Sequence, residues 1–330
     1  MRRVVIVAFV SLVAASCSLP FGIGQASTSQ LINGASDTLS RATGFEIAGK
    51  FTTSNTDFQI DIKYQSSGAA HVNLTFSGHS IEEMQFNGKV YYHGKDAATG
   101  FVGTDTFSQA QPNAIGDKWF TTTKGTPFDM SGFTDASKVK ANFLNTVNVQ
   151  RKDNVTVNGQ DTAELSDSDT ILNITEASPY ELVRLRTQPG KTVSEMSNGD
   201  LVFSNYNKNF NLTEPAGAFN LDDPSTFPPY YVVNSVNLDG CNGDPCTVAA
   251  VVQNKAGTQG ASGPSTVTFT ATNDTDSSVL GTCKVTISPD LANGATTTVK
   301  CQITGGSWTA FVQNGGNYTV KAEPDNPAYD

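Results

Sequence analysis

The stretch FEIAGKF (45–51), followed by FQIDIKY (58–64) and HVNLTF (71–76), decides the fold. In each stretch apolar side chains alternate with polar ones, and this two-residue period is that of a β-strand with one apolar face and one wet face. The connections "SSG", "FSGH" and "FNGK" carry Ser-Gly or Asn-Gly pairs, which are typical of tight turns between antiparallel strands. These residues predict an antiparallel sheet with one apolar face.

The β pattern continues along the chain for about 160 residues. Further strands are predicted at IEEMQFN, KVYYHGK and DKWFTTT, and again from VNVQ (147–150) to the segment GDLVFSNYNKNFNL, which Pro215 closes. Helices are predicted from Ser27 or Thr28 to about Gly44, where apolar residues fall at helical spacing, near 107–115, and around 134–145. The sequence therefore predicts a mainly β fold with a few helices, in which one extended antiparallel sheet has only two substantial helices to cover its apolar face.

The chain changes character after residue 215. The segment PAGAFNLDDPSTFPP holds four prolines, which cannot donate ladder hydrogen bonds, so 216–229 is interpreted as a linker. Seven short strands are then predicted in 230–330, from YYVVNSVNL through WTAFVQ to NYTVKAEP. Their regular spacing is typical of an immunoglobulin-like β-sandwich, although Trp308 follows Cys283 and Cys301 instead of lying between them as in antibody domains.

The first residues have the composition of a secretory signal segment. Arg2 and Arg3 precede an apolar run of about a dozen residues, which is too short to span a bilayer comfortably. The run ends in "AASC" (14–17), which resembles the lipobox of bacterial lipoproteins and implies an acylated Cys17. The alternative is an ordinary signal peptide in which Cys17 is incidental. We expect a signal peptide (1–16), a tether (17–29), a main domain (30–215), the linker and the sandwich, held by lipid at the extracytoplasmic face of the cell membrane.

The other four cysteines all lie in the last third of the chain. Four cysteines allow three disulfide connectivities, of which Cys241–Cys246 and Cys283–Cys301 is favoured, because Cys283 and Cys301 would face each other if their strands formed a hairpin. A zinc site is the competing interpretation. Export to an oxidising compartment and the lack of a nearby histidine argue against it.

Charge and motifs exclude several classes of function. The net charge of −10 repels phosphate backbones, so nucleic acid is not an expected partner. The sequence lacks the GxSxG, HExxH, phosphate-loop and GxGxxG motifs, and the three histidines, His71, His79 and His93, are interpreted as surface residues. Neighbouring carboxylates such as Glu82 and Glu83 would point to opposite faces of a strand. We expect no catalytic residues, no bound metal and no cofactor.

Several motifs in residues 30–215 occur together in a known order. These are NGKVYYHGK (87–95), KWF (118–120), VNGQDTAELS (157–166), YELVRLR (180–186) and LVFSNYNKNFNLTEP (201–215). In order and spacing they resemble the LolA-like lipoprotein-carrier superfamily, especially the LppX/LprG-type actinobacterial lipoproteins, although Asn205 stands where the family usually has aspartate. The C-terminal sandwich lies outside the family's usual single-domain pattern.

The resemblance implies a curved half-barrel sheet that wraps around helices and encloses a cavity for acyl chains. The implied function is binding of a lipid or other amphiphile for transport or presentation; the alternative is an envelope protein that senses or binds a protein partner and carries no lipid. The apolar strand residues would line the cavity or, alternatively, form a packed core. The candidate cavity residues are Phe45, Ile47, Phe51, Phe58, Ile60, Ile62, Tyr64, Val72, Leu74, Phe76, Phe86, Tyr92 and Trp119.

Overall fold

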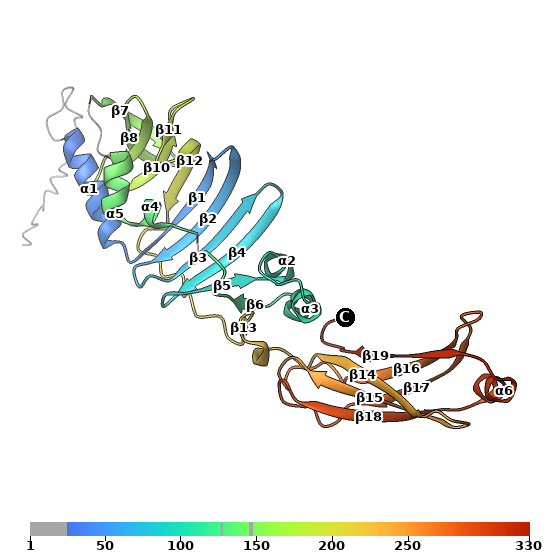
Figure 1. Cartoon of the computed structure of the whole chain (residues 1–330). Helices are drawn as coiled ribbons and strands as arrows, with labels where there is room; N and C mark the ends of the chain where they lie inside the picture. Colours follow the sequence, from blue (N-terminus) through green and yellow to red (C-terminus); the bar gives the residue numbers. More distant parts are fainter. Residues whose placement is uncertain (1–24, 127, 145–147) are drawn as a thin grey trace, which may run out of the picture.

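The computed structural model describes residues 25–126, 128–144 and 148–330. Cys17 and the predicted signal segment lie outside the described residues. The fold is mainly β, with one large curved sheet in the first two thirds of the chain and two small sheets in the last third (Figure 1). No helix of the described residues is long and apolar enough to cross a membrane.

The large sheet has 13 strands in the order β13-β6-β5-β4-β3-β2-β1-β12-β10-β9-β8-β7, with β11 paired to β12. All its pairs are antiparallel except β13 with β6, which run parallel, so the sheet is mixed where the sequence predicted a purely antiparallel one. The strands are β1 (Gly44–Thr53), β2 (Thr56–Gln65), β3 (Ala70–Phe76), β4 (His79–Phe86), β5 (Lys89–His93), β6 (Trp119–Thr121), β7 (Gln150–Val157), β8 (Gln160–Ser166), β9 (Thr170–Thr175), β10 (Leu182–Thr187), β11 (Thr192–Val193), β12 (Met196–Ser204) and β13 (Phe219–Asn220).

Two local features set the strand pairing. The β4–β5 turn has Asn87 at φ 49° and Gly88 at φ 76°, both left-handed, as a two-residue hairpin turn requires. At the β1–β12 pair, a Cβ on Gly49 would lie 2.1 Å from the Asp200 carbonyl oxygen. Only glycine therefore allows the early strand β1 to approach β12 so closely, and this pairing joins the two halves of the sheet.

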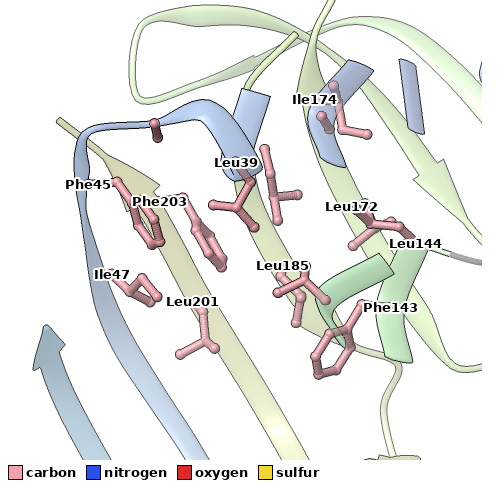
Figure 2. Packing of buried hydrophobic residues seen from close by; sticks show 14 of the residues in the cluster. Leu39, Phe45, Ile47, Phe143, Leu144, Leu172, Ile174, Leu185, Leu201 and Phe203 are labelled. Atoms are coloured by element: carbon pink, nitrogen blue, oxygen red, sulfur yellow. The ribbon is translucent and has the colours of Figure 1, made fainter. Parts of the chain in front are cut away.

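Helices cover one face of this sheet. Helix α1 (Thr28–Arg41) begins with a capping box, in which the Ser27 side chain accepts from the Gln30 backbone N–H and the Gln30 side chain accepts from the Ser27 N–H. It packs beside α5 (Ala136–Val139) and the π-helical turn η1 (Lys140–Leu144). Figure 2 shows Leu39, Phe143 and Leu144 from this layer packed with core side chains of the strands, among them Phe45, Ile47, Leu172, Ile174, Leu185, Leu201 and Phe203.

The helix predicted around 134–145 is broken into short pieces. α4 (Ser131–Thr134) ends before Asp135, whose ψ of 110° is extended. The Asp135 carboxylate then accepts hydrogen bonds from the backbone N–H groups of Ser137 and Lys138 and caps α5. The predicted helix near 107–115 is present as α3 (Thr106–Ile115), and a short α2 (Lys95–Thr99) precedes it.

The last third of the chain forms two three-stranded antiparallel sheets, β14-β15-β18 and β17-β16-β19, around a shared core. The strands are β14 (Tyr231–Gly240), β15 (Cys246–Asn254), β16 (Thr266–Asn273), β17 (Val279–Thr286), β18 (Thr296–Ile303) and β19 (Tyr318–Asp325). WTAFVQ, predicted as a strand, is instead helix α6 (Gly306–Asn314). Trp308 and Phe311 are three residues apart and stack at 5.8 Å, and glycines flank both ends, which favours a short helix over a strand.

Both predicted disulfides are present. Cys241 pairs with Cys246, and Cys283 pairs with Cys301 at a Cα–Cα distance of 6.1 Å. The hairpin expected for the second pair is wrong, because β17 and β18 belong to different sheets. This disulfide therefore links the two sheets of the sandwich.

An aromatic cluster joins the two parts of the molecule. The ring of Phe107, on α3, lies 6.0 Å from that of Phe227, 5.3 Å from that of Tyr230 and 6.3 Å from that of Tyr329. The Asn113 side chain also donates to the Tyr329 carbonyl at 2.8 Å. We call this contact around Phe107, Phe227, Tyr230 and Tyr329 the interdomain seam. The predicted linker segment contributes β13, a 3-10 turn η2 (Pro224–Thr226) and the buried Phe227 to it.

Candidate ligand pocket

Strand register defines two faces of the large sheet. Ile47 pairs with Ile62, Ile62 with Val72, Val72 with Glu83, and Glu83 with Tyr92. Directly opposite residues of antiparallel strands lie on the same face. We call the face with these residues, against which α1 and η1 pack, the core face, and the opposite one the outer face.

Most of the candidate cavity residues lie on the core face, but many are packed and not open. Phe45, Ile47, Ile60, Ile62 and Val72 are at most 2% exposed and belong to one cluster with the side chains of α1 and η1. These residues therefore form a packed core, which was the alternative to a cavity in the sequence-based prediction.

Phe86 and Trp119 lie on the outer face, so neither can line a cavity on the core face. Phe86 alternates with Gln85, which is on the core face opposite Ala70. Trp119 pairs with His93, and their ring centroids lie 4.8 Å apart. Strand β4 carries apolar residues on both faces and β6 has only three residues, so alternation alone does not fix which face is which.

An aromatic row leads along the core face away from the helices. The ring of Phe51 lies 5.4 Å from that of Phe58, which lies 5.4 Å from that of Phe76, and His79 follows at 6.2 Å. Phe58, Leu74 and Phe76 are only half-buried. Tyr64 is also half-buried and packs on Phe45, with ring centroids 5.2 Å apart. The apolar surface of the face thus extends past the packed core.

A pocket of about 320 Å³ opens where this row meets the helical layer. Its walls are apolar side chains from segments far apart in the sequence. They are Phe51 near the end of β1, Phe128 before α4, Phe133 in α4, Phe143 in η1 and Met196 at the start of β12. Phe133 contacts Phe51 with a ring separation of 6.0 Å. Thr53, Gly132 and Asn142 complete the lining with Asp129, Ser194 and Glu195.

Of these wall residues, only Phe51 is a site residue predicted from the sequence. Phe143 falls within the helix predicted around 134–145. Phe128, Phe133 and Met196 carry no sequence signal for a shared site, because only the folded chain brings their segments together.

The charged groups that line the pocket are both acidic. Asp129 and Glu195 are exposed. Hydrogen bonds from the side chain and backbone of Ser131 hold the pKa of Asp129 below its usual range, so this group is a carboxylate at neutral pH. Glu195 lies in the β11–β12 turn, where Ser194 has φ 47° and Glu195 has φ 66°, a left-handed pair that these residue types rarely adopt.

A buried carboxylate holds the segment before the pocket. Glu83, on the core face, is 3% exposed and accepts the Phe128 backbone N–H at 3.2 Å and the Gln85 side chain at 2.6 Å. Gln85 also donates to the Phe128 carbonyl at 3.1 Å. Burial raises the pKa of Glu83, while its hydrogen bonds with Gln85 and Phe128 act in the opposite direction. These contacts fix Phe128 over the sheet at the pocket wall.

The outer face carries a polar cluster that is separate from the pocket. Glu82 lies 2.7 Å from His71 Nε2 and 2.8 Å from His93 Nδ1, and His93 Nε2 lies 3.4 Å from Asp117. Glu82 and Glu83 point to opposite faces, as the sequence predicted. Across the described residues, no group of three or more histidine, cysteine, aspartate or glutamate side chains is arranged to hold a metal ion.

Tyr92 lies on the core face, directly opposite Glu83. It is 2% exposed, and its ring centroid lies 4.9 Å from that of Phe101 and 5.7 Å from that of Phe120. Tyr92 therefore belongs to the hydrophobic cluster of the interdomain seam and does not line the pocket.

Comparison with known proteins assigns no family. No protein-family model matches the chain, and no curated protein matches it. Among solved structures, a crystal structure of MucB in complex with MucA(peri) aligns with a TM-score of 0.28 and 11% identity, over 79% of this chain and 92% of that one. A TM-score this low does not establish a common fold, and the resemblance to LolA-like proteins stays a prediction.

Proposed function

We propose that this protein binds one apolar chain of a lipid or other amphiphile in the pocket between β1, α4, η1 and β12, for transport or presentation and without covalent chemistry. The observation that carries the proposal is the wall of four phenylalanines and a methionine around space that no side chain fills. We further propose that the protein works outside the cytoplasm, held at the membrane by an acylated Cys17. The signal-like segment and the "AASC" motif support this location.

The size of the pocket limits the ligand. Its volume of about 320 Å³ is at the lower end of the range of about 300–1,000 Å³ for small-molecule sites. One chain or one small apolar group fits this space, and a lipid with several acyl chains would leave the others along the half-buried row of Phe58 and Phe76. Burial of each methylene contributes about 0.8 kcal/mol, so affinity should rise with chain length until the pocket is full.

The test is a titration with alkyl maltosides of increasing chain length, below their micelle concentrations, against the neutral fluorescent probe N-phenyl-1-naphthylamine. The proposal predicts one saturable site, from which longer chains displace the probe more strongly, up to a plateau. Absence of saturable probe binding by folded protein would contradict it.

Contact with another envelope protein is the second candidate function. Among the large hydrophobic residues of the described chain, Val279 and Val312 are the exposed ones, at 57% and 40%. They lie on β17 and α6, which contact each other at the end of the sandwich far from the large sheet (Figure 1). A photoreactive amino acid at Val312 in cells should crosslink one defined protein if this function holds, and an equally exposed control position should not.

A further inference from the structure

Resting on the proposed function, we infer that the pocket selects single-chain amphiphiles with a cationic head group, such as a long-chain amine or quaternary ammonium. The apolar walls would hold the chain, and Asp129 and Glu195 would face the charge at the mouth.

The charges of the residues that line the pocket favour a cationic head group. The wall residues Phe51, Phe133 and Phe143 supply no charge, while both ionisable groups in the lining, Asp129 and Glu195, are acids. An anionic head group at this mouth would lie beside at least one carboxylate, because the pKa of Asp129 is lowered. An ammonium head would also lie close to aromatic rings, which attract cations.

One lysine bears on this charge balance. Lys138 donates to the Ser131 hydroxyl at 2.5 Å and interacts electrostatically with Asp129. Lys138 is exposed and does not line the pocket. The positive charge of Lys138 weakens the negative potential of Asp129 at the mouth of the pocket. Among the described residues, no lysine, arginine or histidine forms an ion pair with Glu195.

The experiment compares three dodecyl probes below their micelle concentrations: dodecyltrimethylammonium, dodecyl maltoside and dodecyl sulfate. At low ionic strength we expect affinity to fall in that order. Each exposed carboxylate can supply up to about a fivefold preference for the cation over the neutral probe, and added salt should reduce it.

The decisive variant is Asp129→Asn/Glu195→Gln, which keeps the shape of both side chains and one accepting oxygen in each. It should lower the affinity for the cationic probe to about that for the neutral probe, so that the preference disappears. Glu323→Gln, at an exposed position on β19, is the control for loss of one negative charge outside the pocket and should keep the preference.

The possible results separate the two proposals. Equal binding of all three probes by the native protein would overturn the charge selectivity and leave the apolar pocket standing. A preference that survives in the double variant would also overturn it, because the overall negative charge would then be the cause. Failure of every probe to bind would refute the proposed function itself.

Discussion

Replacing Gly132 by phenylalanine should fill the pocket from within the protein. Gly132 lines the pocket in α4, and a Cβ at this position would meet no heavy atom within 4 Å. The backbone does not require glycine there, and a non-glycine residue should favour the helix slightly. The variant should therefore fold at least as well as the native protein.

The expected loss of affinity follows from the space that the ring would occupy. If the phenyl group displaces three methylenes of the ligand, the cost is about 2.4 kcal/mol, or ~50-fold in the dissociation constant. Competition between dodecyl maltoside and the fluorescent probe measures this change, and circular dichroism during heating checks the fold.

The matched control is Gly263→Phe, because Gly263 also has no heavy atom within 4 Å of a built Cβ and lies in the sandwich. It should bind both compounds like the native protein. Unchanged binding by folded Gly132→Phe protein would refute the reasoning, since the pocket could not then be the site of the chain.

Three further predictions concern stability. Phe45→Ala removes a fully buried ring and should lower the free energy of unfolding by about 3–5 kcal/mol, measured by urea titration; a loss below 1 kcal/mol would mean that this core is loosely packed. Because burial raises the pKa of Glu83 above 4.5, the folded state holds this proton more tightly than the unfolded state, so stability should fall as pH rises from about 4.5 through the raised pKa. The Glu83→Gln variant should lose less stability over this pH range. If its stability varied with pH as that of the native protein does, Glu83 would not be the cause. Changing both Cys283 and Cys301 to serine removes the link between the sandwich sheets and should cost about 3 kcal/mol in the unfolding of that part, for a separation of 18 residues; an unchanged thermal midpoint would show that the bridge contributes little.

Alternation predicted the sheet because FEIAGKF, FQIDIKY and HVNLTF each bury one face. It succeeded for Phe45, Ile62 and Val72, where every second residue is apolar. It failed for Phe86 because β4 also carries Ile81 on the other face, and only pairing with β3 decides which face meets the helices.

The pocket was beyond prediction from sequence for a different reason. Its walls come from β1, α4, η1 and β12, and the space between them depends on how these segments pack. The interdomain seam was missed similarly: the prolines of 216–229 predicted a linker, but they do not reveal that Phe227 is buried against Phe107.

The most direct test of the central claim is NMR of methyl-labelled methionines during titration with dodecyl maltoside. Met196 lines the pocket, whereas Met84 lies on the outer face opposite His71 and Tyr91 and serves as an internal control. We expect the Met196 methyl signal to shift saturably with one equivalent of ligand while the Met84 signal stays in place. Saturable binding without a shift at Met196, or equal shifts at both methyl groups, would contradict the account.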